Sequence, residues 1–167
     1  TIGLDRVTKM WAERRLEAGP CRPGGRECID LVGSLRLHLI YNPGAAFSKG
    51  LGLGPLFGVV AAVMAVVLLR LAATSTDRVR VVLFGLIAGG AVGNLIDRVV
   101  RAESGFLSGS VIDFIDAQWW PVFNVADAAV VCGVIAFAST SGRSLKPSSM
   151  RVSANTAVAP HRSAISG

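Results

Sequence analysis

Hydrophobic residues along this chain gather in three long runs. The first covers residues 51–73, in which Arg70 is the only charged residue, and the others cover residues 79–96 and 122–138. A helix rises about 1.5 Å per residue, so about 20 apolar residues cross the roughly 30 Å hydrocarbon core of a bilayer. A soluble protein with three such helices would have too little polar sequence left to cover them. The pattern therefore predicts three membrane-spanning helices.

The part of the chain before the first run follows other patterns. Charged residues begin at Asp5 and no apolar core of a signal peptide is present, so we expect residues 1–10 to be the last turns of a further membrane helix. From Leu35 to Leu39, leucine alternates with Arg and His, which is typical of a half-exposed strand. Residues 42–44, Asn-Pro-Gly, are expected to end this strand.

Composition also indicates a lipid environment. Hydrophobic residues make up 51% of the 167 residues and charged residues 17%, whereas soluble domains have about 45 to 50% and about 25%. The net charge of +6 would favour a nucleic-acid partner if the basic residues clustered on a soluble domain, but they are spread along the chain. We therefore expect contact with membrane lipid and no contact with nucleic acid.

The positions of Arg and Lys predict how the helices are oriented, because cytoplasmic loops collect these residues. Arg70, Arg78 and Arg80 lie at the junction of the first two runs, and residues 140–167 contain four basic residues and no acidic one. Both segments are expected in the cytoplasm, which places residues 97–121 outside. Because each span changes the side of the membrane, residues 1–50 are also expected outside. Their eight basic residues oppose this placement, since such residues normally collect in the cytoplasm. We expect residues 1–139 to form one membrane domain and residues 140–167 a disordered cytoplasmic tail.

Polar side chains cluster at the outer ends of the predicted spans. Asp127 lies inside the third run, and an ionisable group there is costly unless it faces a polar cavity. Asn124 lies one helical turn before it, Asn94 and Arg98 lie one turn apart near the end of the second run, and Asp113 follows in the outer loop. We expect these groups to meet at the outer interface.

Two carboxyl groups at the edge of a low-dielectric site share one proton, because like charges a few ångströms apart do not ionise together easily. The ionised group can accept a proton from water while the protonated group polarises a scissile amide. This chemistry requires no metal and no cofactor. Two alternatives remain from spacing alone: the polar residues only join helices through hydrogen bonds, or Asp127 relays protons in a small transporter.

The three cysteines and two histidines do not predict a metal site, since no Cys-x-x-Cys pair is present and His38 and His161 lie far apart. Cys21 and Cys28 would close a small loop in an oxidising compartment, but burial as small hydrophobic side chains is the ordinary alternative. The sequence leaves both interpretations open.

Four stretches together resemble one protein family. They are LDRVTK at residues 4–9, YNPGAAFS at 41–48, GGAVGNLIDR at 89–98, and VIDF at 111–114 with FNVAD at 123–127. Their order is similar to that of the lipoprotein signal peptidases (signal peptidase II), and the resemblance covers about residues 4–138. It implies an all-α polytopic membrane protein, a four-helix bundle with a small extracytoplasmic β platform. Most of the first helix would lie before residue 1.

The resemblance also implies an activity and a site. It implies an aspartic endopeptidase of the inner membrane that cuts prolipoproteins before the diacylglyceryl-modified cysteine, at the extracytoplasmic face. By motif, Asp113 and Asp127 look like the catalytic dyad. Asp97 is the alternative to Asp113, although its place directly before Arg98 favours an ion pair. The supporting residues implied by the motifs are Asn42, Asn94, Arg98, Asn124, Asp5 and Lys9.

Overall fold

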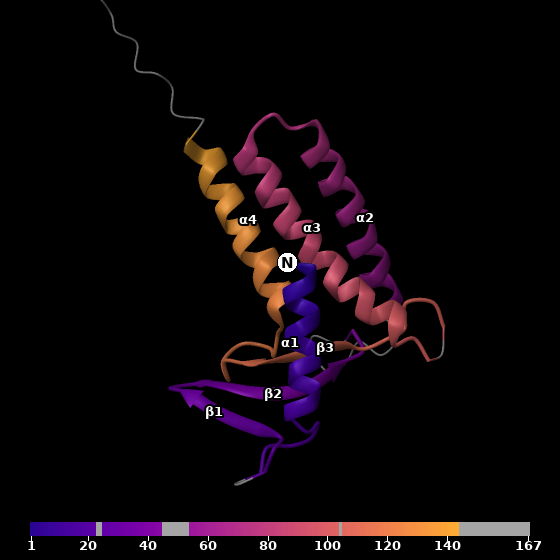
Figure 1. Cartoon of the computed structure of the whole chain (residues 1–167), viewed down its shortest axis with the longest axis vertical. Helices are drawn as coiled ribbons and strands as arrows, with labels where there is room; N and C mark the ends of the chain where they lie inside the picture. Colours follow the sequence, from indigo (N-terminus) through magenta and orange to yellow (C-terminus); the bar gives the residue numbers. More distant parts are fainter. Residues whose placement is uncertain (23–24, 45–53, 104, 144–167) are drawn as a thin grey trace, which may run out of the picture.

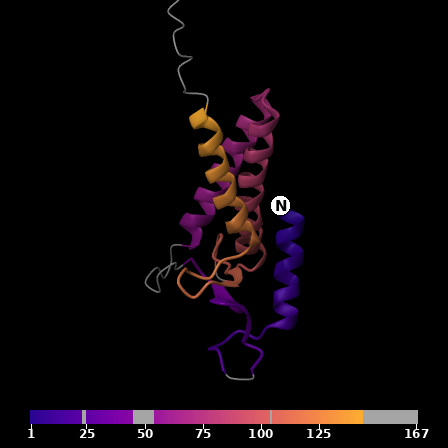
Figure 2. The same ribbon diagram turned by 90° about the vertical axis from the view of Figure 1, so that its left-hand side faces the viewer.

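A computed structural model describes residues 1–22, 25–44, 54–103 and 105–143 of the chain. Within these residues, α2, α3 and α4 run side by side, and a small sheet lies across one end of them (Figure 1). The view turned by 90° shows α1 on one side of this layer, reaching from the helices to the sheet (Figure 2). The elements in chain order are α1 (Ile2–Arg15), β1 (Cys28–Val32), β2 (Leu35–Asn42), α2 (Gly54–Thr74), α3 (Arg78–Val100), β3 (Val111–Asp116) and α4 (Val125–Arg143).

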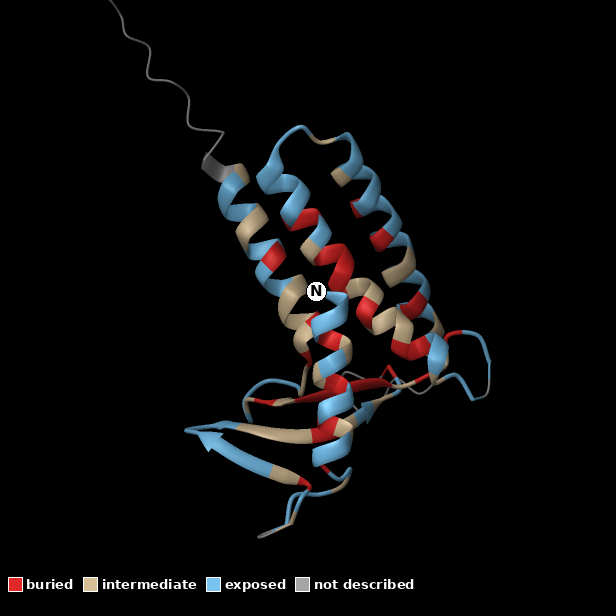
Figure 3. Ribbon diagram, in the orientation of Figure 1, coloured by how far each residue is buried: buried red, intermediate tan, exposed pale blue. Residues whose placement is uncertain are grey.

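Two of the described helices, α2 with 21 residues and α3 with 23, are long and apolar enough to cross a membrane. Many apolar side chains of α2 are exposed, and its outer surface is pale blue in Figure 3. Such a surface is unusual in water but ordinary in lipid. The two helices correspond to the predicted spans 51–73 and 79–96, of which residues 51–53 lie outside the described residues.

The last helix differs from its predicted bounds. It begins at Val125, three residues after the start of the predicted run, because Asn124 caps it. The Asn124 Oδ1 atom accepts a hydrogen bond from the Asp127 amide at 3.0 Å, and an Asp127 carboxylate oxygen accepts one from the Asn124 amide at 3.1 Å. This reciprocal pair is a capping box. The helix then continues to Arg143, so residues 140–143 are helical and do not belong to a disordered tail; residues 144–167 lie outside the described residues.

The first helix also extends further than the predicted residues 1–10, since it ends at Arg15. One face of this helix is buried and carries Asp5, Lys9 and Ala12, which are spaced by one or two helical turns. At its end, Ala12 and Leu16 pack with hydrophobic side chains of β2 and β3 in one core. This packing joins α1 to the sheet.

The sheet is antiparallel, with the strand order β1-β2-β3. The strand predicted over Leu35–Leu39 is confirmed, and it continues to Asn42. The third strand was expected to be part of the outer loop between the second and third predicted spans. It is a strand nearly buried on both faces, with Ile112 and Phe114 in the core with α1. Opposite Asp113 in the sheet lies Ile40 of β2, while Asn42 lies opposite Val111.

Glycines in α3 allow its neighbours to approach closely. A side chain at Gly93 would place its Cβ atom 2.7 Å from a carboxylate oxygen of Asp5 in α1. A Cβ atom at Gly90 would overlap the carbonyl oxygen of Ala126 in α4. Small residues serve this purpose between helices in membranes. The Gly-rich sequence of α3 therefore brings α1 and α4 together over the polar end of the bundle.

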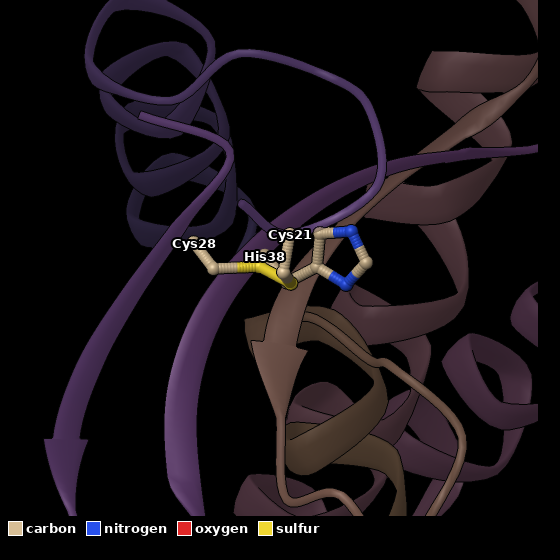
Figure 4. A group of neighbouring side chains, drawn as sticks. All are labelled: Cys21, Cys28 and His38. Atoms are coloured by element: carbon tan, nitrogen blue, oxygen red, sulfur yellow. A yellow bond between two sulfur atoms is a disulfide. The ribbon is translucent and has the colours of Figure 1, made fainter. Parts of the chain in front are cut away.

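A disulfide joins Cys21 and Cys28, so the question that the sequence left open is answered in favour of a closed loop. Figure 4 shows this bond beside His38 of β2, whose Nε2 atom lies 2.9 Å from the carbonyl oxygen of Gly19. The loop between α1 and β1 is thereby held to the middle strand. Cys132 of α4 is a free and exposed thiol.

Candidate active site

Asp113 lies near the middle of β3 with 3% of its surface exposed. One carboxylate oxygen accepts a hydrogen bond from the side-chain amide of Asn124 at 2.7 Å, and the other accepts one from Asn42 at 3.0 Å. Asn42 is the last residue of β2, so the antiparallel pairing of β2 with β3 brings these two motifs together. Two amides therefore orient this carboxyl group.

Asp127 lies in the first turn of α4, where it is half-buried. The side-chain amide of Asn94 in α3 donates a hydrogen bond to it at 2.7 Å, in addition to the capping bond from the Asn124 backbone. The positive end of the helix dipole favours a negative charge at this position. From the sequence, Asp127 was expected about five residues inside the third apolar run, and the structure places it three residues nearer to the helix end, because α4 begins at Val125.

Asn124 joins the two carboxyl groups. Its side-chain amide nitrogen donates to Asp113, and its side-chain oxygen accepts from the Asp127 backbone. The same nitrogen lies 3.0 Å from the side-chain oxygen of Asn94. Because Asn124 is fully buried, its contacts constrain the positions of β3, α3 and α4 relative to one another. The Asn124 side chain thus fixes the position of the Asp113 carboxyl group relative to that of Asp127.

A charged cluster lies on the α1 side of these amides. Lys9 is fully buried, and its ammonium group lies 2.9 Å from Asp5 and 2.7 Å from Asp97. It also donates a hydrogen bond to the side-chain oxygen of Asn94 at 2.9 Å, which orients that amide toward Asp127. The other Asp5 oxygen accepts from the backbone amide of Ala126 at 3.1 Å. Asp5 and Lys9 therefore support the site from α1.

The two rival carboxylates, Asp97 and Asp113, have different surroundings. Besides Lys9, Asp97 contacts Arg6 at 3.6 Å and accepts a hydrogen bond from the Ile112 amide. The ion pair expected from the sequence is present, but its partners are Lys9 and Arg6 of α1 and not the neighbouring Arg98. Asp116, three residues after Asp113, pairs with Arg36 at 2.7 Å at the other end of the strand. Burial acts to raise the pKa of Asp116, but hydrogen bonds and the charge of Arg36 hold it below its usual value.

A pocket of about 250 Å³ opens between α2 and the polar groups, and we call it the carboxylate pocket. Asp113 and Asp127 both line it, while Asp97 is not among its described lining residues. Arg98 also lines it and donates a hydrogen bond to the Gly109 carbonyl at 3.3 Å. Phe57 and Ala61 form the apolar wall of this pocket on α2. They were not predicted from the sequence, in which their spacing of one helical turn is the signal that points to a shared face. The remaining described lining residues are Asn42, Gly44, Asn94 and Val111.

Burial raises the pKa of Asp113 from 3.8 to about 7, and the negative charge of Asp127 adds to this rise. The hydrogen bonds from Asn42 and Asn124 act in the opposite direction but do not cancel it. A carboxyl group with such a pKa holds a proton in part of the population near neutral pH. The site thus pairs a proton-holding group with a second carboxyl group at a helix N-terminus.

The chain is similar to known proteins in sequence and in fold. A family model described as signal peptidase (SPase) II matches residues 1–142. The lipoprotein signal peptidase of Rhodococcus jostii is 38% identical over 151 residues, covering 90% of this chain and 72% of that protein. The corresponding protein of Streptomyces coelicolor is 41% identical over 145 residues, covering 86% of this chain and 67% of its own length.

A solved structure described as a bacterial membrane enzyme has the same fold, with a TM-score of 0.71 and 24% identity over 90% of this chain and 87% of that one. A second one has a TM-score of 0.68 and 25% identity over 87% of this chain and 88% of its own. The match to the family model over most of the chain and the identity to two relatives agree, and the chain belongs to the signal peptidase II family of aspartic-type membrane proteases.

Proposed function

We propose that Asp113 and Asp127 are the catalytic dyad with which this chain cleaves prolipoproteins before their diacylglyceryl-modified cysteine. The observation that carries the proposal is that Asn124 links both carboxyl groups at one pocket. Aspartic proteolysis needs two carboxyl groups that share a proton. The chemistry needs neither a metal ion nor a cofactor.

The two carboxyl groups have different roles in this mechanism. Asp127 is the ionised member, because the helix N-terminus, the Asn94 amide and the Asn124 backbone amide all favour its negative charge. Asp113 is the protonated member, because burial raises its pKa to about 7. Asp127 takes a proton from water while the oxygen attacks the scissile carbonyl carbon, and Asp113 donates its proton toward the carbonyl oxygen. When the intermediate collapses, Asp127 passes its proton to the leaving nitrogen and Asp113 recovers its own.

The supporting residues hold this pair in place. Asn42 and Asn124 orient Asp113, and Asn94 orients Asp127. The cluster of Asp5 and Lys9 fixes Asn94 from α1. The guanidinium of Arg98 lines the same pocket and supplies positive charge next to the developing negative charge on the substrate oxygen.

We infer that the site lies at the extracytoplasmic face of the inner membrane. The basic residues Arg70, Arg78 and Arg80 surround the opposite end of α2 and α3, and cytoplasmic ends collect such residues. The sheet then forms the extracytoplasmic platform above the membrane. In this orientation a lipid-modified peptide in the outer leaflet lies at the depth of the carboxylate pocket.

The test compares carboxylate variants in liposomes with a diacylglyceryl-modified prolipoprotein as substrate. Asp113→Asn and Asp127→Asn are each expected to lower kcat by at least about a thousandfold, as removal of an acid or base group that acts jointly with a second one does. Asp116→Asn is the matched control, because Asp116 lies on the same strand but pairs with Arg36. Full activity of either dyad variant would remove that residue from the mechanism. Ion flux without cleavage would support a transporter instead.

Asp97→Asn tests whether Asp97, and not Asp113, is the first catalytic carboxylate. Asp97 is bound to buried Lys9, so its loss is expected to lower stability more than the rate of the folded fraction. The measurement is cleavage per folded molecule, with the folded fraction taken from size-exclusion chromatography. A loss per folded molecule as large as that of Asp113→Asn would transfer the catalytic role to Asp97.

A further inference from the structure

A second pocket, of about 400 Å³, lies on the other side of Asp127, and we call it the apolar pocket. The loop between β3 and α4 and the first turns of α4 form its walls. Apart from Asp127, each described side chain that lines it is apolar or a thiol: Ala117, Trp119, Trp120, Phe123, Ala128, Val131 and Cys132. The carboxylate pocket, by contrast, is lined by three polar side chains besides its two carboxylates. Asp127 is the residue that both pockets share among the described residues.

The wall of the apolar pocket is attached to the strand that carries Asp113. The Ile115 amide donates a hydrogen bond to the Phe123 carbonyl at 2.8 Å, and the Phe123 amide donates one to the Ile115 carbonyl at 3.0 Å. At the other end of the loop, the Gln118 amide donates to Asp116 at 2.7 Å. These bonds hold the loop in register with β3. The apolar pocket and the two carboxyl groups are therefore parts of one connected structure.

The outer edge of the apolar pocket has the character of a membrane interface. Trp119 and Trp120 are 76% and 58% exposed, and their rings pack edge to face with centroids 6.2 Å apart. Tryptophan is enriched where a membrane protein crosses from hydrocarbon to headgroups. Val131, one turn after Asp127 on α4, is 52% exposed on the hydrocarbon side of this position. An apolar chain in the outer leaflet has direct access to the pocket.

We propose that the apolar pocket binds an acyl chain of the substrate's diacylglyceryl group while the peptide occupies the carboxylate pocket. This inference rests on the proposed function. The diacylglyceryl group is attached to the side chain of the residue that directly follows the scissile bond, so its chains begin only a few bonds from the reacting atoms. A lipid site that shares a catalytic carboxylate satisfies this requirement.

The pocket is expected to act by positioning the acyl chain, and through it the scissile bond, more than by binding the chain tightly. An acyl chain that leaves the bilayer for the pocket exchanges one apolar environment for another, so burial alone supplies little driving force. An acyl chain fixed beside Asp127 orients the adjacent scissile peptide bond. Orientation of the reacting groups is a major source of rate acceleration in enzymes. We therefore expect the pocket to make cleavage depend on acyl-chain length.

The first experiment fills the pocket and uses a matched control on the same helix. Val131→Trp places a large ring in the pocket, whereas Val134→Trp adds the same ring at a site that is equally exposed, at 50%, and is not among the described lining residues. The substrates are prolipopeptides with two hexadecanoyl or two octanoyl chains in liposomes. The ratio of kcat/KM for the long over the short substrate is expected to exceed 5 in the wild type and in Val134→Trp. In Val131→Trp this ratio is expected to fall below 2.

The second experiment measures binding without cleavage. Asp113→Asn holds uncleaved substrate and leaves the apolar pocket intact, since Asp113 is not among its described lining residues. Prolipopeptide with bromine atoms on its acyl chains is expected to quench tryptophan fluorescence saturably, and substitution of Trp119 and Trp120 by Phe should remove most of the quenching. Brominated phospholipid at the same mole fraction is the control, and it should quench weakly and without saturation.

The results that would refute the acyl-chain site differ from the result that would refute the proposed function. Cleavage by the wild type with equal long-to-short ratios in Val131→Trp and Val134→Trp would overturn the acyl site and leave the peptidase intact. Equal quenching by brominated phospholipid would show that the pocket only contacts bulk lipid. Absence of cleavage of either substrate by the folded wild type would instead refute the proposed function.

Discussion

Replacement of Asp113 by Asn is expected to change how the stability of the protein depends on pH. The substitution removes the ionisation of this side chain while nearly keeping its size. Asp113 is 3% exposed, and burial together with the charge of Asp127 raises its pKa from 3.8 to about 7. The folded protein therefore binds this proton more tightly than the unfolded chain does. The wild type should lose stability as pH rises from about 4 to about 7.

The magnitude follows from the interval between the two pKa values. From 3.8 to about 7 is about three pH units. Each unit corresponds to about 1.4 kcal/mol, so ionisation of Asp113 costs the folded state about 4 kcal/mol. The Asn side chain has no such cost, although it loses one hydrogen bond at every pH. Between pH 4 and pH 8, the wild type should thus lose about 4 kcal/mol of unfolding free energy relative to Asp113→Asn.

The assay is equilibrium unfolding in mixed detergent micelles at several pH values, followed by tryptophan fluorescence. All other titrating groups are present in both proteins, so the difference between the two curves reports the ionisation of Asp113 together with its coupling to Asp127. Asp116→Asn is a control of opposite sign, because Arg36 holds the pKa of Asp116 below its usual value and its stabilisation is lost as pH falls. Parallel curves for the wild type and Asp113→Asn would show that burial does not raise the pKa of Asp113.

Three further changes have defined outcomes. Lys9→Met removes the buried cation between Asp5 and Asp97 and leaves Asp97 with the more distant Arg6, so it is expected to cost about 3 to 5 kcal/mol in the same unfolding assay; a loss below about 1 kcal/mol would contradict the charge cluster. Gly58→Ala brings a Cβ atom to 2.9 Å from the Cδ1 atom and 3.0 Å from the Cβ atom of Leu107, so it should cost about 1 to 3 kcal/mol, and Leu107→Gly in the same protein should relieve most of the crowding. A chelator should leave the rate of prolipoprotein cleavage unchanged, since the proposed chemistry uses no metal, and inhibition reversed by added metal would refute it.

The sequence by itself determined the elements whose signals are local. The apolar runs predicted the two long helices, and the alternation from Leu35 to Leu39 predicted the middle strand. The motifs identified the polar residues that meet at the carboxylate pocket, including Asn42, which is far from the others in the chain. These features could be predicted because helix period, strand period and motif order are each written in consecutive residues.

The tertiary structure decided how those residues face one another. The sequence favoured Asp113 over Asp97 as the first carboxylate of the dyad, and the packing of α1 adds that Asp97 binds Lys9 while Asp113 lines the pocket. The capping box of Asn124 starts α4 at Val125 and so places Asp127 in the first turn of the helix, nearer to its end than the apolar run predicted. The physical reason is that each of these contacts joins segments far apart in sequence or depends on a few backbone hydrogen bonds. Neither kind of contact leaves a periodic pattern along the chain.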